Sequence, residues 1–185
     1  MMSSCLPSGA EYMGEAIEHK AMRQSRKLTP LMGFIRYKAA ISPRADVETG
    51  AWLSVGHNSR VSSFVRICSN GGPVVIGPNT DIGVSSFIGG GREGVRIGRN
   101  CLISPHCWIG TSHYEVPASV KVPPDRKQGM IVIGDNVWVG AGAVILDDVA
   151  VGSGAIISPN SVVTSNIPEN AIVQGNPAKT IFIRR

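Results

Sequence analysis

Branched apolar residues recur at every sixth position along most of the chain. Counted in steps of six, the longest run is Ile133, Val139, Ile145, Val151, Ile157 and Val163. Three shorter groups keep this spacing, namely Val55, Val61 and Ile67, then Ile76, Ile82 and Ile88, and then Ile97, Ile103 and Ile109. Val and Ile are stiff at Cβ and favour the pleated surface of a strand. A fixed period indicates a repeat architecture, so the pattern predicts a solenoid of short strands.

Two further positions of each hexapeptide are restricted. We call the fifteen Val and Ile residues listed above the starts of the hexapeptides. The residue after each start is Gly in nine cases and Ser in three, which suits a sharp turn. The residue four after a start is small or apolar, as in Thr80, Ser86, Cys101, Cys107, Val137, Ala143, Val149, Ala155 and Ser161. Because alternate residues of a strand face the same side, we expect starts and second sites to line one interior. Cys101 and Cys107 are then predicted to be buried thiols that pack like small hydrophobic residues.

The interruptions of the hexapeptide period predict where extra residues are inserted into the solenoid. The step between starts widens at three places, and three hexapeptides separate each break from the next. The unit is therefore a coil of 18 residues with three strands and three corners, and the extra residues enter at one corresponding corner. Two insertions are short and rich in Gly, at Ser69–Val75 and Gly90–Arg96, and the third, 112–132, is long. Insertions gathered on one face commonly mark the binding face of a solenoid.

Composition narrows the class of protein. A chain of 185 residues has room for about one domain, and 22 Gly, 43% hydrophobic and 17% charged residues argue against disorder and against a helical bundle. The net charge of +5 is spread out and aromatic residues are few, which disfavours a nucleic-acid binder but suits a phosphorylated small molecule. The chain has no run of 18 apolar residues and no signal-peptide order at its start, so we expect a cytoplasmic protein without an integral membrane segment.

The hexapeptide pattern resembles that of the hexapeptide-repeat acyltransferases. The resemblance implies an all-β fold over 41–185, a single-stranded left-handed parallel β-helix of triangular section. The left-handed winding comes from the family alone, because parallel crossovers are generally right-handed. Before it, Met13, Ile17 and Ala21 are spaced for a weakly amphipathic helix. We therefore expect residues 1–40 to form a short helical segment that caps the first coil or touches a neighbouring subunit.

Two segments are similar to the sugar O-acetyltransferase branch of that family, which includes galactoside and maltose acetyltransferases. They are Ile133–Gly142, with Trp138 at its centre, and the ending from Asn166 through Lys179. The resemblance implies direct transfer of acetyl from acetyl-CoA to a hydroxyl of a sugar, without an acyl-enzyme. It also implies a homotrimer whose active sites are completed between adjacent prisms. The histidine of the long insertion, His113, then faces the acetyl-CoA-binding coils of a neighbour.

The long insertion carries the candidate general base, His113, the one histidine within it. A neutral imidazole can take a proton from an alcohol, and the family places its catalytic histidine at the head of such an extension. Glu115 or a backbone carbonyl could orient this imidazole. The resemblance gives Trp138 a role in orienting the imidazole or flanking the acetyl group, with simple corner packing as the alternative. Backbone N–H groups near Gly140 and Ala141 would stabilise the oxyanion.

Further site residues follow from the resemblance, position by position. The contacts to the pantetheine arm fall on Ala141, Pro159 and Thr164, with Ser165 adjacent, and Lys179 matches a residue that meets the CoA phosphates, with Arg184 as a further candidate. The galactoside and maltose enzymes bind their acceptor with an Asn, whereas this chain has Gly83 at that position and Ser85 nearby. We therefore expect Ser85 on the acceptor side and a larger or activated acceptor, such as a cell-envelope polysaccharide, its lipid-linked precursor or a nucleotide sugar.

Three alternatives stay open at this point. N-acetylation of an amino sugar uses similar machinery, and a silent β-helix could act as a scaffold. The γ-carbonic anhydrases share the expected fold and need three imidazoles for zinc, but the spacing of His57, His106 and His113 differs from theirs. We expect no metal requirement.

Overall fold

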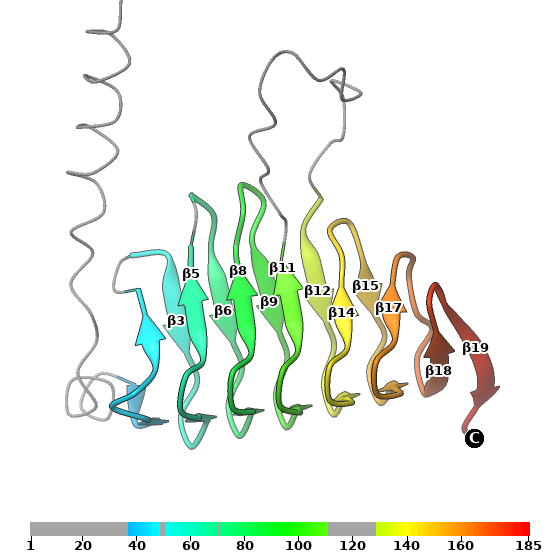
Figure 1. Ribbon diagram of the computed structural model, residues 1–185, viewed down its shortest axis with the longest axis horizontal. Helices are drawn as coiled ribbons and strands as arrows, with labels where there is room; N and C mark the ends of the chain where they lie inside the picture. Colours follow the sequence, from blue (N-terminus) through cyan, green and yellow to red (C-terminus); the bar gives the residue numbers. More distant parts are fainter. Residues whose placement is uncertain (1–36, 49–50, 70, 111–128) are drawn as a thin grey trace, which may run out of the picture.

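The computed structural model describes residues 37–48, 51–69, 71–110 and 129–185, and they wind into one parallel β-solenoid (Figure 1). The chain passes through three sheets in turn and then moves one step along the solenoid. Every pair of neighbouring strands is parallel except the last, β18 with β19, which is antiparallel. The all-β, left-handed parallel β-helix that the family resemblance implies is confirmed.

We call the three sheets I, II and III, in the order in which the chain meets them. Sheet I contains β1 (Ala40–Ile41), β4 (Arg60–Val61), β7 (Asp81–Ile82), β10 (Leu102–Ile103), β13 (Trp138–Val139), β16 (Ile156–Ile157), β18 (Ala171–Gly175) and β19 (Ala178–Ile183). Sheet II contains β2 (Asp46–Val47), β5 (Arg66–Cys68), β8 (Phe87–Gly89), β11 (Trp108–Gly110), β14 (Val144–Ile145) and β17 (Val162–Val163). Sheet III contains β3 (Leu53–Val55), β6 (Val74–Ile76), β9 (Val95–Ile97), β12 (Ile131–Ile133) and β15 (Ala150–Val151). Edge A joins sheets I and II, edge B joins sheets II and III, and edge C joins sheets III and I.

The core is a stack of the predicted repeat positions. All fifteen hexapeptide starts are at most 3% exposed, and the second sites named above are equally buried. Ile41 and Val47 are buried in the same way and extend the stack to the first described coil. The predicted interior is therefore confirmed, and the hydrophobic effect acts on nearly every start, at roughly 25 cal/mol for each Å² of apolar surface buried.

Glycine is required after the hexapeptide starts for a different reason from the sharp turn that the sequence pattern suggests. The left-handed backbone conformation falls three residues after a start, as in Asn79 and Asn136, and not on the glycine itself. A Cβ on Gly77 would lie 2.5 Å from the carbonyl carbon of Gly98 in the next coil. Close stacking of coils, and not the turn, therefore requires glycine there.

The second sites form a hydrogen-bond ladder inside the solenoid. The Thr80 hydroxyl donates to the Gly98 carbonyl at 2.9 Å and accepts from the Cys101 amide at 3.1 Å. The Cys107 thiol likewise donates to the Gly140 carbonyl at 3.2 Å, and its burial raises its pKa to about 11. Burial also raises the pKa of Cys101. The prediction that Cys101 and Cys107 are buried thiols is confirmed, and they also serve as donors.

The insertions leave the solenoid at one edge, as predicted. Strands β5, β8 and β11 all end at edge B, which Figure 1 shows along the upper side of the solenoid. Most of the insertion 112–132 lies outside the described residues, as do 1–36 of the expected helical cap. In the described part of the chain, no helix is long and apolar enough to span a membrane.

Candidate active site

Trp138 lies on the outer face of sheet I, where it is 45% exposed. Its indole N–H donates to the Ser104 hydroxyl at 3.1 Å, and Ser104 belongs to the edge A turn of the preceding coil. This hydrogen bond directs the indole along the surface toward edge A. In the hexapeptide pattern, Ser104 is one of the three Ser residues that stand in place of Gly after a start, and this replacement is the sequence signal that distinguishes it.

Two residues that the resemblance assigns to acetyl-CoA binding lie on the same edge. Ala141 lies in the edge A turn that comes directly after β13, and Pro159 lies in the turn of the next coil. The Asn160 amide donates to the Ala141 carbonyl at 2.9 Å, which stacks the two turns. Coils repeat at about 4.8 Å, the spacing of hydrogen-bonded strands. The structure thus brings Ala141 and Pro159 together along edge A, and the Trp138 indole is directed toward that edge from sheet I.

The structure corrects the expected oxyanion donors. The Gly140 amide donates to the Ile157 carbonyl at 2.7 Å as part of the sheet ladder, so it is not available for an oxyanion. The Ala141 amide has no acceptor among the described residues. Ala141 is also exposed at the turn. It is therefore the one amide of this pair that could face developing negative charge.

The two basic candidates lie at different edges. Lys179 is exposed near the start of β19 and pairs with Gln174 at the end of β18, close to edge A. The Gly175 amide donates to the Ser161 hydroxyl at 3.2 Å, which fixes this hairpin against the coil of Pro159. Arg184 instead donates to the Gly154 carbonyl at edge C. Lys179 therefore continues the row of Ala141 and Pro159, whereas Arg184 does not.

Thr164 and Ser165 are not on edge A. They follow β17 and lie at edge B, whereas Pro159 precedes β17. One strand of sheet II thus separates them from Ala141 and Pro159. The resemblance placed all four residues in one set, but it could not show that the last coil divides them between two edges.

Ser85 lies at edge A two coils before Ala141, exposed and with a positive φ of 57°. Its amide donates to the Ser63 carbonyl at 3.1 Å. The coil of Ser104 lies between the two, because β10 pairs with both β7 and β13. Ser85 therefore lies on the same edge as Ala141 and Pro159, the residues expected to contact acetyl-CoA.

His113 and Glu115 lie outside the described residues. The described ends of their insertion, Gly110 and Gly129, are at edge B. Edge B joins sheets II and III, so it lies opposite sheet I, the face that carries Trp138. Within one chain, the insertion and Trp138 therefore start from opposite sides of the solenoid.

The described histidines do not come together. His57 is at edge C and His106 is at edge A, and no group of three or more His, Cys, Asp or Glu side chains in the described ranges is arranged to hold a metal ion. A three-histidine zinc site would have to combine residues from different edges. The geometry gives the hydratase alternative no support.

Two family models match the chain. One, a bacterial transferase hexapeptide model of six repeats, matches residues 130–165, and the other, a hexapeptide repeat of succinyl-transferase, matches residues 73–104. Both matches fall on hexapeptides that form the solenoid.

Two of the named relatives carry the names of O-acetyltransferases, one of lipopolysaccharide biosynthesis and one of galactosides. The chain is 30% identical over 156 residues to a protein of Escherichia coli K12 called "Putative lipopolysaccharide biosynthesis O-acetyl transferase WbbJ", which covers 80% of this chain and 76% of that one. It is 33% identical to the galactoside O-acetyltransferase of Escherichia coli K12 over 47% of this chain and 43% of that one. A solved structure of the Bacillus cereus N-acyltransferase AntD, in complex with dTDP and coenzyme A, has a similar fold, with a TM-score of 0.69. That similarity covers 80% of this chain and 82% of AntD at 22% identity.

Proposed function

The chain belongs to the hexapeptide-repeat acetyltransferases of the sugar branch, and on that premise we propose that it transfers acetyl from acetyl-CoA to a hydroxyl of a cell-envelope polysaccharide or its precursor. The observation that carries the proposal is the exposed Trp138, whose indole is hydrogen-bonded to Ser104 and directed toward edge A, where the Ala141 amide has no acceptor among the described residues. The name of the WbbJ relative supports a lipopolysaccharide-type acceptor and an ester product.

The proposed reaction is a direct transfer. His113 takes the proton of the acceptor hydroxyl as its oxygen attacks the thioester carbon. The Ala141 amide stabilises the negative charge that develops on the carbonyl oxygen. The carbon–sulfur bond then breaks, the ester is released, and the CoA sulfur receives the proton from the His113 imidazolium. Proton and electrons balance without a metal or a redox partner.

We propose that acetyl-CoA lies along edge A. The exposed small residues Ala141 and Pro159 leave room for the pantetheine arm, and Lys179, one coil further on, supplies a point charge for the CoA phosphates. An acetyl-CoA molecule on edge A would contact Thr164 and Ser165 only by crossing the end of sheet II, beside β17. The coenzyme A in the AntD structure is consistent with this choice of co-substrate.

The opposite placement of edge B and Trp138 supports the proposed homotrimer. An insertion that starts at edge B can meet the sheet I face of a second copy when two prisms lie side by side. Sheet I carries an outward apolar column in register, namely Leu102, Trp138, Ile156, Ile172 and Phe182, and several of its members are exposed. A second copy would cover part of this column and supply its His113.

The second candidate is N-acetylation of an amino nucleotide sugar, which the fold of AntD with its bound dTDP favours. Product chemistry separates the two. The purified protein is incubated with acetyl-CoA and panels of glycans and amino nucleotide sugars, and the acetylated product is treated with mild alkali before mass spectrometry. We expect the acetyl group to be lost, as for an ester; an acetyl group that survives would identify an amide and overturn the proposed O-transfer.

A further inference from the structure

Three successive turns of edge A hold side chains in a backbone conformation that disfavours them. The left-handed residues at the other edges are Asn58, Asn79, Asn100, Asn136, Asp148 and Asn170, together with Lys38. On edge A the equivalent residues of three successive turns are Phe64, Ser85 and His106, with φ of 60°, 57° and 61°, and only the next two turns return to Gly142 and Asn160. Asn, Asp and to some degree His tolerate this region, whereas a bulky Phe is an outlier. Strain of this kind clusters at functional sites.

Phe64 carries a second cost. Its side chain is 61% exposed, so it forgoes burial, and the Arg44 guanidinium lies 6.0 Å from its ring centroid. An exposed aromatic ring on a strained backbone does little for the fold. It does offer a flat apolar face to a ligand.

The three side chains form a row that leads toward Trp138 and Ala141. The Ser85 amide donates to the Ser63 carbonyl at 3.1 Å, and the His106 amide donates to the Val84 carbonyl at 2.9 Å. The Gly142 amide donates to Pro105 at 3.0 Å and joins the row to the Ala141 turn. From the coil of Phe64 to that of Ala141 there are three coil steps, about 14 Å.

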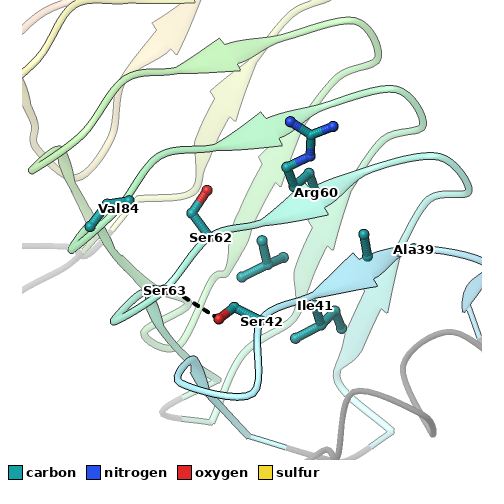
Figure 2. Close-up of a pocket in the computed structure, with 9 residues that line it drawn as sticks. Ala39, Ile41, Ser42, Arg60, Ser62, Ser63 and Val84 are labelled. Carbon is teal, nitrogen blue, oxygen red and sulfur yellow. Dashed lines mark hydrogen bonds between the residues drawn. The ribbon is translucent and has the colours of Figure 1, made fainter.

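An open pocket of about 520 Å³ adjoins the start of this row (Figure 2). Its polar lining consists of Ser42, Ser62, Ser63 and the Arg60 side chain, and Val84 closes one end. The hydroxyls of Ser42 and Ser63 are 2.9 Å apart and hydrogen-bonded. The volume is in the range of small-molecule sites, and the lining offers hydroxyls and a guanidinium to a polar ligand.

Building on the proposed function, we propose that Phe64, Ser85 and His106, with the adjoining pocket, bind the acceptor, and that the acceptor is a saccharide of more than one ring. The Phe64 ring packs against the apolar face of a sugar ring, while the Ser85 hydroxyl and the His106 imidazole bond sugar hydroxyls. Because the coil of Phe64 lies about 14 Å from the coil of Trp138 and Ala141, the proposed site is longer than one sugar ring. It therefore selects a chain whose outer ring reaches the acetyl group.

The test measures glycan binding separately from catalysis. The full-length protein and the variants Phe64→Asn and His106→Asn are applied to an array of bacterial polysaccharide fragments, from single sugars to tetrasaccharides. Lys38→Asn is the matched control, because it places the same residue in the same conformation away from edge A. Wild type should bind fragments of two or more rings at least about tenfold better than single sugars, and both edge A variants should lose about tenfold. Lys38→Asn should bind like wild type.

Folding and assembly are measured on the same samples. Asn relieves the strain, so Phe64→Asn should melt at the same temperature or about 2–4 °C higher, and coenzyme A binding by calorimetry should be unchanged. Unchanged glycan binding by folded Phe64→Asn, binding of single sugars only, or no binding by wild type would each overturn the proposal. A change of oligomeric state in Phe64→Asn would overturn it too, and assign the row to contact between copies. Failure of the proposed function is distinct, since wild type would then bind the glycan without acetylating it.

Discussion

At the scale of single residues, the hexapeptide divides its side chains between two tasks. Residues such as Thr80 and Cys107 satisfy the interior, where each donates to a carbonyl of the next coil. Trp138 and Phe64 face outward and do little for the core. The interior residues contribute to stability, whereas the outward ones are those to which we assign binding.

The buried hydrogen bonds of Thr80 predict that Thr80→Val destabilises the protein. Val has nearly the same shape, but it leaves the Gly98 carbonyl and the Cys101 amide buried without their partner. We expect a loss of about 1–3 kcal/mol in the free energy of unfolding, measured by urea denaturation. Thr180→Val, at an exposed position of β19, is the control and should change stability by less than about 0.5 kcal/mol. Equal effects of the two changes would contradict the ladder.

The buried thiol predicts a pH dependence. The pKa of Cys107 is raised by burial to about 11 in the folded protein, so the folded state holds this proton more tightly than the unfolded chain. Stability is therefore complete below the ordinary thiol pKa and falls as pH rises toward 11. In Cys107→Ser, which keeps the donor as Ser86 does in the preceding coil, the urea midpoint should fall less between about pH 8 and about pH 10.5. Parallel pH profiles for the two proteins would show that Cys107 makes no such contribution.

At the scale of elements, spacing alone predicted the strands, the three corners and the edge of the insertions. Each start is a large branched residue in a two- or three-residue strand, so the period is itself the core, and all fifteen starts are buried. The sequence pattern alone does not reveal the role of the glycines, because close approach of coils depends on distances between residues one coil apart, such as Gly77 and Gly98. The division of Thr164 and Pro159 between two edges was missed for a related reason, since it depends on the direction of one strand, β17.

Close stacking of coils predicts a large effect of a single methyl group. Gly77→Ala places a Cβ against the backbone of Gly98 and Arg99, which cannot move aside as a flexible side chain could. We expect a loss of about 1–3 kcal/mol or more in the free energy of unfolding by urea. Ser158→Ala, at the same position of a later hexapeptide, adds no atom and should change stability by less than about 0.5 kcal/mol. A neutral Gly77→Ala would mean that the coils are not packed this closely.

At the scale of the whole molecule, the shape of the solenoid separates the residues of the proposed site. The insertion leaves edge B, whereas Trp138 and the Ala141 turn lie on sheet I and edge A. The sequence could name these residues but not their faces, because facing follows from how three sheets close into a prism. A site that uses both sets is most simply completed between two copies of the chain.

Subunit mixing tests this arrangement. His113→Asn and Trp138→Ala should each lack acetyl transfer as separate homo-oligomers. Dissociated and reassembled together, they should regain activity, up to about a quarter of wild type, because some sites then combine the intact His113 of one copy with the intact Trp138 of another. Sedimentation should show trimers before and after mixing. Trimers that stay inactive would place both residues of a site in one chain.

The most direct test of the central claim is acetyl transfer itself, measured as acetyl-CoA consumption and acetylated product with bacterial polysaccharide acceptors. We predict that wild type forms an acetyl ester only when an acceptor is present, and that folded His113→Asn is slower by about 100- to 10,000-fold, the usual contribution of a general base. Unchanged transfer by His113→Asn, or no thioester cleavage by wild type with any acceptor, would contradict the account.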